Sequence, residues 1–237
     1  MSPRRLIVNA DDFGQSPGIN SGIIACHKGG VVSSASLMVR WPAAVEAAEL
    51  ARQHPAMSVG LHIDLCEWSE TAGEWQPLYE VVPPDDETRV REEILRQFEV
   101  FEQLMGQPPT HVDSHQHVHR EGVAHRVAKE MASRLGVPLR QFHPRIRYDG
   151  RFYGQGRNAQ SCPDWISVDA LIRLIETLPA GITELGCHPA HGRDVDSMYR
   201  DEREVEVATL CDPRVREALD ANGVVLVSFR DALPGIR

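Results

Sequence analysis

Two adjacent carboxylates follow the first apolar run of the chain. Residues 5–9 read as a buried strand, and Asp11, Asp12 and Gly14 come directly after it. Neighbouring side chains on an extended segment point in different directions, so one carboxylate can ligate a metal ion while the other acts as a base beside it. The alternative is a turn in which Asp12 caps the next segment and Gly14 takes a positive φ. Other residues must decide between the two interpretations.

The densest group of ionisable side chains lies in residues 110–119, where His or Asp occupies every odd position from His111 to His119. If this segment is extended, a period of two directs these side chains to one face, where they can form a metal site or an acid–base site. The alternative is a solvated, tag-like histidine run. Val112 and Val118 argue against that alternative, because they give the segment the character of a strand.

Two further apolar runs carry histidines at or near their ends. His62 and Asp64 fall on one face of the expected strand 58–65, and His188 follows the run 182–187. A core histidine bonded to a backbone carbonyl would explain His62 alone. If the strands form a barrel, however, the polar residues at their carboxyl ends meet at one mouth.

These residue types suit one kind of chemistry. One carboxylate with two imidazoles is a ligand set for zinc or a similar divalent ion, with positions left open for water and substrate. Such a metal lowers the pKa of bound water and polarises a carbonyl, while a second carboxylate can act as base and a further histidine can protonate a leaving amine. The residues therefore predict a metal-assisted hydrolase of an amide, an ester or a phosphoester.

The elements that must position these residues alternate between β-branched runs and segments of helical periodicity. We expect strands at 5–9, 34–39, 58–65, 110–114, 139–142, 182–187 and 224–228, and helices at 17–28, 42–53, 86–105, 123–135 and 168–178. About seven βα units predict an α/β fold with a parallel sheet closed as a barrel, in a single domain over residues 1–237.

Two long segments, 66–84 and 145–165, do not fit this alternation and are expected to be loops on the catalytic face. The alternative is that they are insertions that only extend the rim. Their aromatic side chains are candidates for stacking on sugar rings, although loop aromatics also anchor loops to their own domain. These residues are Trp68, Trp75, Tyr148, Phe152, Tyr153 and Trp165.

The overall composition limits the classes of partner. The net charge of −9 argues against a nucleic-acid partner, and no apolar run approaches the roughly 20 residues that cross a bilayer. The first residues run straight into a strand without the apolar stretch of a signal peptide. Five widely spaced cysteines suggest neither a disulfide framework nor a thiolate zinc site. We therefore expect a cytoplasmic protein with no membrane or nucleic-acid partner.

Taken together, the motifs resemble those of the YdjC-like carbohydrate deacetylases, which include chitooligosaccharide deacetylases. The resemblance covers nearly the whole chain and rests on residues 6–14, 60–62, 110–119 and 187–189. It implies a distorted TIM-like barrel, commonly a homodimer, with a divalent metal held by Asp12, His62 and His115. It also implies Asp11 as the base and His188 as the acid or an oxyanion partner.

One departure from the family pattern falls inside the motif. Chitooligosaccharide deacetylases often have three consecutive histidines after the Asp-Ser pair, whereas Gln116 stands here between His115 and His117. The change leaves the expected ligand His115 in place. The two long segments match poorly and are expected to select the sugar, with Trp68, Trp75, Tyr153 and Trp165 as candidate substrate-binding residues.

The leading hypothesis is a metal-dependent N-deacetylase that releases acetate and a free amine from an N-acetylated sugar or oligosaccharide. The metal is zinc or magnesium, with manganese and cobalt also compatible with mixed oxygen and nitrogen ligands. A metal-dependent phosphoesterase is a second hypothesis, but the chain lacks a glycine-rich phosphate loop. A sugar-binding barrel without activity is the third, and Asp11 argues against it, because a binding protein needs no unliganded carboxylate beside the water.

Overall fold

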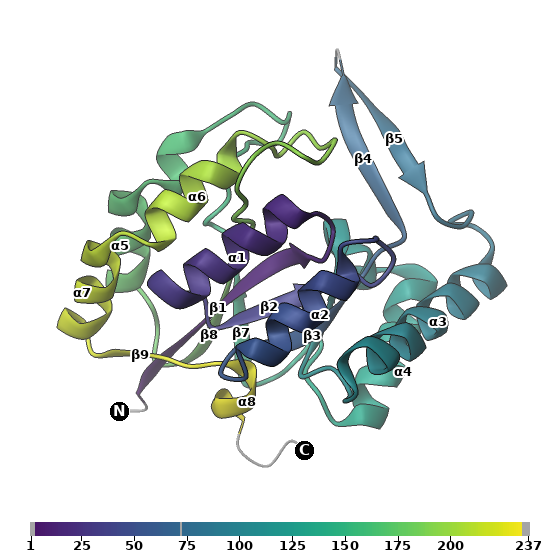
Figure 1. The fold of residues 1–237 in the computed structure, drawn as a ribbon, viewed down its shortest axis with the longest axis horizontal. Helices are drawn as coiled ribbons and strands as arrows, with labels where there is room; N and C mark the ends of the chain where they lie inside the picture. Colours follow the sequence, from purple (N-terminus) through teal and green to yellow (C-terminus); the bar gives the residue numbers. More distant parts are fainter. Residues whose placement is uncertain (1–2, 72, 234–237) are drawn as a thin grey trace.

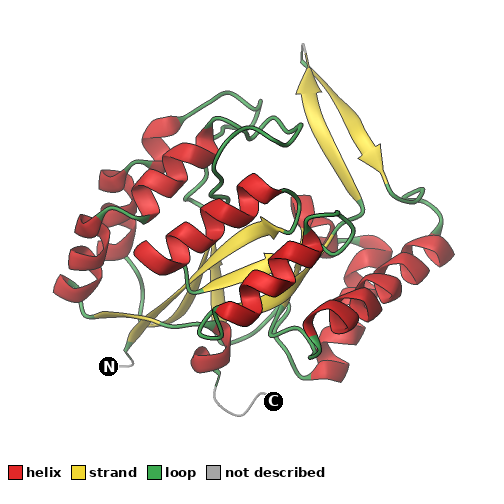
Figure 2. Ribbon diagram, viewed as in Figure 1, coloured by secondary structure: helices red, strands yellow, loops and turns green. Residues whose placement is uncertain are grey.

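The fold is a curled parallel sheet with helices packed on its outer face (Figures 1 and 2). The computed structural model describes residues 3–71 and 73–233. The sheet has seven strands in the order β6-β3-β2-β1-β8-β7, with β9 paired to β1. Its strands are β1 (Arg4–Phe13), β2 (Ser34–Leu37), β3 (Ser58–Ile63), β6 (Val112–Ser114), β7 (Ile146–Asp149), β8 (Gly181–Cys187) and β9 (Val224–Leu226). The predicted α/β barrel-like fold of about seven strands is confirmed, as a half-barrel whose order ends at β6 and β7.

Most of the helices cover the outer face of the sheet, and one short helix closes its amino-terminal end. They are α1 (Pro17–Gly29), α2 (Ala44–Gln53), α3 (Glu87–Met105), α4 (Gly122–Leu135), α5 (Val168–Glu176), α6 (Glu202–Leu210), α7 (Pro213–Ala221) and α8 (Phe229–Ala232), with short 3₁₀ turns η1 (His115–Arg120) and η2 (Pro163–Ile166). Helix α6 packs against α1, which brings its first turns close to the end of β1. None of the helices within the described residues is long and apolar enough to cross a membrane.

Alternation along β1 separates an apolar outer face from a polar inner face. Leu6 and Val8 belong to the large core under the helices, whereas Asn9 and Asp11 take part in a network of buried polar side chains. Ile7, at the start of the inner face, belongs to a separate small apolar cluster. The inside of the half-barrel therefore changes from apolar to polar toward the carboxyl end of the strand, where the predicted site lies.

Helix α8 closes the amino-terminal end of the half-barrel. Phe229 packs in the small cluster with Ile7 and Ile146, and its ring stacks on His111 at a centroid distance of 3.7 Å. Gly60 leaves the room for this histidine, since a Cβ there would come within 2.5 Å of the His111 ring. His111 is thus a packed interior residue and not part of the predicted metal site.

Several local predictions were wrong. No strand forms over residues 139–142, because Leu139 makes only an isolated bridge to Val112 and a turn follows. The next strand of the sheet along the chain is β7, which lies inside the segment 145–165 that was expected to be a loop. Helices α6 and α7 had not been predicted. The extended segment 110–119 also ends early, because Gln116 and His117 take left-handed φ angles of 47° and 56° after β6.

The segment 66–84 is not a simple loop either. It forms an antiparallel hairpin of β4 (Cys66–Thr71) and β5 (Glu74–Glu80) that projects from the body of the molecule (Figure 1). The hairpin starts three residues after β3 ends, so its base lies at the carboxyl edge of the sheet.

Candidate active site

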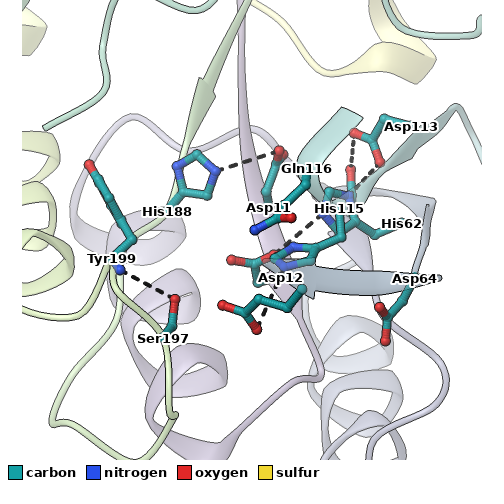
Figure 3. Close-up of polar contacts among 12 residues, drawn as sticks. Asp11, Asp12, His62, Asp64, Asp113, His115, Gln116, His188, Ser197 and Tyr199 are labelled. Atoms are coloured by element: carbon teal, nitrogen blue, oxygen red, sulfur yellow. Dashed lines mark hydrogen bonds and ion pairs between the residues drawn. The ribbon is translucent and has the colours of Figure 1, made fainter. Parts of the chain in front are cut away.

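A pocket opens at the carboxyl ends of β1, β3, β6 and β8, and Figure 3 shows the polar residues at its centre. All five residues predicted to ligate metal or to catalyse line it. Its lining is Asp11, Asp12, His62, Glu67, Ser114, His115, Gln116, His117, Tyr148, Gly150, Phe152, Tyr153, Gly186, His188, Ser197, Met198, Tyr199 and Arg203.

A bulge at the end of β1 delivers both adjacent carboxylates to this pocket. The register of β1 against β2 shifts between Ala10 and Phe13, and Asp12 has a left-handed φ of 66°. In a regular strand the two side chains would point to opposite faces; the bulge re-aims one of them. A non-glycine residue in this conformation is strained, and such strain is typical of functional sites.

The side chains of Asp12, His62 and His115 converge on one point. Asp12 Oδ1 lies 3.0 Å from His115 Nδ1 and 3.4 Å from His62 Nε2, and one ligand atom of each residue lies within 4.8 Å of the others. Ligands of a tetrahedral zinc ion, each about 2.0–2.2 Å from the metal, stand roughly 3.3–3.6 Å apart. The spacing and the donor types therefore fit a divalent metal ion.

His62 is oriented from its other side. Its Nδ1 lies 2.7 Å from Asp113 Oδ1, and Asp113 in turn accepts a 2.7 Å hydrogen bond from Ser36. Burial lowers the pKa of His62, but Asp113 and Asp12 outweigh burial and raise that pKa to about 9 in the absence of a metal. Asp113 thus fixes which nitrogen of His62 faces Asp12.

Asp12 is held as a carboxylate by an arginine from a distant helix. Its Oδ2 accepts a 2.7 Å hydrogen bond from Arg203 of α6, which is buried. Burial would raise the pKa of Asp12, but Arg203 and His115 hold it well below the usual range. Asp12 is therefore ionised, as a metal ligand must be.

Asp11 has a different set of partners. Both of its oxygens accept hydrogen bonds from Arg140, at 2.6 and 2.7 Å, and Arg140 also binds Asp113 and Glu184. Burial raises the pKa of Asp11, but Arg140 outweighs burial and lowers it. Glu184 shares the same arginine and is wholly buried, so burial raises its pKa to about 7. Asp11 is thus an ionised carboxylate whose orientation Arg140 fixes, and it lies outside the ligand cluster of Asp12, His62 and His115.

Comparison with known proteins places the chain in a family. The family model described as YdjC-like protein matches residues 5–221. The chain belongs to the YdjC-like family. A carbohydrate deacetylase from Geobacillus stearothermophilus is 35% identical and aligns with 97% of this chain and 98% of its own length. A chitooligosaccharide deacetylase from Serratia marcescens is 33% identical, over 95% and 98% of the two chains. The family resemblance predicted from the motifs is confirmed.

Solved structures agree with this assignment at the level of the fold. A protein from Enterococcus faecalis V583, named for a proposed cellobiose-phosphate cleavage, is 25% identical with a TM-score of 0.75, over 97% of this chain and 98% of that one. A family 4 carbohydrate esterase from Streptomyces lividans is 16% identical with a TM-score of 0.56, over 95% and 93% of the chains. The second likeness concerns the fold alone.

In this YdjC-like chain His188 lies across the pocket from the ligand cluster (Figure 3). Its Nε2 is 3.8 Å from Asp11 Oδ2, while its backbone N–H donates to Glu206. Burial lowers the pKa of His188 to about 4, although Asp11 opposes that shift. Glu206 also accepts from the Tyr199 hydroxyl, and burial raises its pKa to about 8. His188 is therefore neutral at rest and faces Asp11.

The candidate substrate-binding residues fall in three places. Tyr153 lines the pocket and stacks on Tyr199 with a centroid distance of 4.5 Å. Trp68 lines a neighbouring groove at the base of the hairpin. Trp75 and Trp165 are 48% and 51% exposed and do not line this pocket, so their contact with substrate stays a prediction.

Sequence reasoning missed Arg140, Arg203 and Asp113 as partners of the site residues. Asp113 stood in the histidine-rich segment, and its odd-numbered position placed it on the inner face with His111. The two arginines gave no local signal, because their partners lie 129 and 191 residues away. Asp64, expected beside His62, instead accepts hydrogen bonds from Arg40 and Tyr79.

Proposed function

We propose that this YdjC-like chain is a metal-dependent carbohydrate N-deacetylase, which hydrolyses the acetamido group of an N-acetylated sugar to acetate and a free amine. The observation that carries the proposal is Asp11, a buried and ionised carboxylate outside the cluster of Asp12, His62 and His115. Asp11 also lies near His62 and Asp113, but the guanidinium of Arg140 already pairs with the carboxylates of both Asp11 and Asp113. A protein that only binds metal and sugar needs no carboxylate such as Asp11. The deacetylase names of two relatives over 30% identical support the same activity.

The ligand cluster would hold the ion through Asp12, His62 and His115, and the bound divalent ion would supply Lewis-acid activation of water and of the acetyl carbonyl. Arg203 keeps Asp12 ionised, and Asp113 orients His62. These two partners prepare the ligands before any metal arrives, which lowers the cost of ordering them on binding.

Asp11 accepts a proton from the attacking water. Arg140 binds both oxygens of Asp11 and fixes the direction in which its remaining lone pairs point. Because the pKa of Asp11 is lowered, the carboxylate is ionised at neutral pH and readily passes a captured proton on.

His188 is the group that receives this proton in the proposed sequence. Its Nε2 lies 3.8 Å from Asp11 Oδ2, and it is neutral at rest. The protonated ring then delivers the proton to the nitrogen of the departing sugar amine as the carbon–nitrogen bond breaks. Tyr148, Tyr153 and Tyr199 line the pocket and offer aromatic faces against which a pyranose ring can pack.

Three finer points belong to the same proposal. We infer zinc as the first candidate for the ion, because two imidazoles suit zinc better than magnesium, with manganese and cobalt next. Five free cysteines support a reducing, cytoplasmic location. A homodimer follows from the family expectation, and gel filtration with light scattering tests it.

The decisive experiment measures acetate release from a panel of N-acetylated mono- and oligosaccharides by the purified, metal-loaded protein. We expect acetate from at least one sugar, loss of release after treatment with a chelator, and recovery with Zn²⁺. Phosphate release from phosphoesters in place of acetate would identify a phosphoesterase. Sugar binding without either product would identify a barrel that has lost its activity.

A further inference from the structure

The two imidazoles of the ligand cluster are not supported equally. Each ring turns one nitrogen to Asp12: His62 turns Nε2, at 3.4 Å, and His115 turns Nδ1, at 3.0 Å. The other nitrogen of His62 lies 2.7 Å from Asp113. The other nitrogen of His115, Nε2, is buried and has no hydrogen-bond partner among the described residues.

One carboxylate faces that unpartnered nitrogen. Glu67 Oε2 lies 3.8 Å from His115 Nε2, a distance typical of an ion pair but too long for a hydrogen bond. The Glu67 residue is only 3% exposed and lines the pocket. No hydrogen bond to its carboxylate is found within the described part of the chain, and its oxygens are not among the buried polar atoms left without a partner. The carboxylate therefore faces the open pocket and is free to take a further partner. A buried nitrogen without a partner and a carboxylate free of other hydrogen bonds thus face each other, and their 3.8 Å separation exceeds a hydrogen-bond distance by less than one ångström.

The hairpin that carries Glu67 is fastened to the turn that carries His115. Glu67 lies in β4, next to Trp68. The side-chain amide of Gln116 bonds both backbone groups of Trp68: the Trp68 N–H donates to Oε1 at 3.0 Å, and Nε2 donates to the Trp68 carbonyl at 2.9 Å. Gln116 itself has a left-handed φ, so this pair of hydrogen bonds also stabilises the turn after His115. Gln116, next to His115, therefore ties the backbone beside Glu67 to the turn that follows His115.

We propose that Glu67 is the positioning residue of His115, as Asp113 is of His62, and that Gln116 holds it in place. By accepting a hydrogen bond from Nε2–H, Glu67 would fix the tautomer in which the lone pair of Nδ1 faces Asp12 and the metal. Carboxylate partners of ligating histidines raise metal affinity about 10- to 100-fold. The inference rests on the proposed metal centre but does not depend on which bond the enzyme cleaves. It makes the projecting hairpin part of the metal site.

The test is a titration of the metal-free protein with Zn²⁺ in the presence of a competing chelator, without any sugar. We expect Glu67→Leu to weaken Zn²⁺ binding about 10- to 100-fold. Glu67→Gln should recover part of the loss, because the amide oxygen still accepts a hydrogen bond. Gln116→Ala should weaken binding less than Glu67→Leu. Glu74→Leu, an exposed change in the same hairpin, serves as the control and should bind as the wild type does.

A second measurement separates positioning from folding. Nitrogen-15 NMR of the imidazole rings should place the His115 proton on Nε2 in the Zn²⁺-bound wild type, and this preference should weaken in Glu67→Leu while the His62 signals stay unchanged. Wild-type Zn²⁺ affinity in Glu67→Leu overturns the proposal, and so does a loss of hydrolysis at unchanged affinity, which would place Glu67 on the substrate. A wild type that binds no divalent ion overturns it together with the metal centre, whereas metal binding without acetate release overturns only the proposed activity.

Discussion

The floor and the rim of the pocket differ in how their side chains are held. On the floor, Asp11 and Asp113 share Arg140, and each of these three is buried with partners at 2.6 to 2.7 Å. By contrast, Trp75 and Trp165 are about half exposed and do not line the pocket; they lie in the hairpin and in the segment 150–165, which we call the rim. Asp11 and Asp113 lie at strand ends and Arg140 in the turn after Leu139, whereas Trp75 belongs to the hairpin and Trp165 to η2. The groups that need fixed geometry are therefore set in the buried interior, and the exposed aromatic side chains lie in the segments around it.

The largest effect should come from the ligands on the floor. Asp12→Ala, His62→Ala or His115→Ala should each remove the bound metal and abolish hydrolysis, because two protein ligands are too few to hold a labile divalent ion. Elemental analysis after gel filtration measures the metal content, and Trp75→Ala on the rim should keep it. A ligand variant with full metal content and activity would exclude that residue from the site.

The next effect concerns stability and contrasts a buried arginine with an exposed one. Arg140→Met leaves three buried carboxylates without their cation, so the free energy of unfolding should fall by about 3–5 kcal/mol in urea titrations. Arg151 pairs with Asp149 at the surface and is 64% exposed. Arg151→Met should cost at most about 1 kcal/mol. Equal losses in the two variants would contradict the contrast between floor and rim.

Asp11→Asn tests whether Asp11 is the base and Asp12 the metal ligand. The amide cannot accept the proton of water, so turnover should fall by roughly 10²-fold or more at nearly normal metal content. His188→Ala should also retain metal and lose less activity if water can deliver the proton. Loss of metal in Asp11→Asn would mean that the roles of the two carboxylates are exchanged.

The smallest effect is expected on the rim. Trp75→Ala and Trp165→Ala should weaken the binding of longer oligosaccharides several-fold relative to a monosaccharide, because stacking is gained ring by ring while the floor is common to every substrate. The measurement is the ratio of kcat/KM for long and short substrates. An unchanged ratio in both variants would limit substrate recognition to the tyrosines of the pocket.

The strand ends could be predicted from the sequence because they depend on a local pattern. Alternation over a few residues was enough to place His62 at a strand end, and short apolar runs marked β1 and β8. The predicted strand 139–142 failed because its short run forms a turn that instead carries Arg140 inward. The hairpin β4–β5 was missed because nearly all residues of β5 are exposed, so that strand has no alternation of apolar buried and polar exposed side chains.

The histidine-rich segment shows the limit of such patterns. A period of two holds through Ser114, but the left-handed residues Gln116 and His117 then turn the chain. As a result His115 reaches the ligand cluster, whereas His119 is buried away from it, with its Nδ1 2.6 Å from the hydroxyl oxygen of Ser114. The positive φ of Gln116 could not be predicted locally, since the contact of its side chain with Trp68, 48 residues away, supports this conformation.

The two buried arginines also have a consequence for how the chain folds. Arg140 closes a loop of 129 residues onto Asp11, and Arg203 closes one of 191 residues onto Asp12. Such distant contacts form only after most of the chain has collapsed, since closing long loops costs conformational entropy before any contact repays it. A partly folded chain therefore has the ligands in its sequence but not the pocket, and metal affinity should appear late, together with the native state. Because the metal binds only the native state, it stabilises that state, and proteolysis of unfolded molecules should become slower when metal is bound.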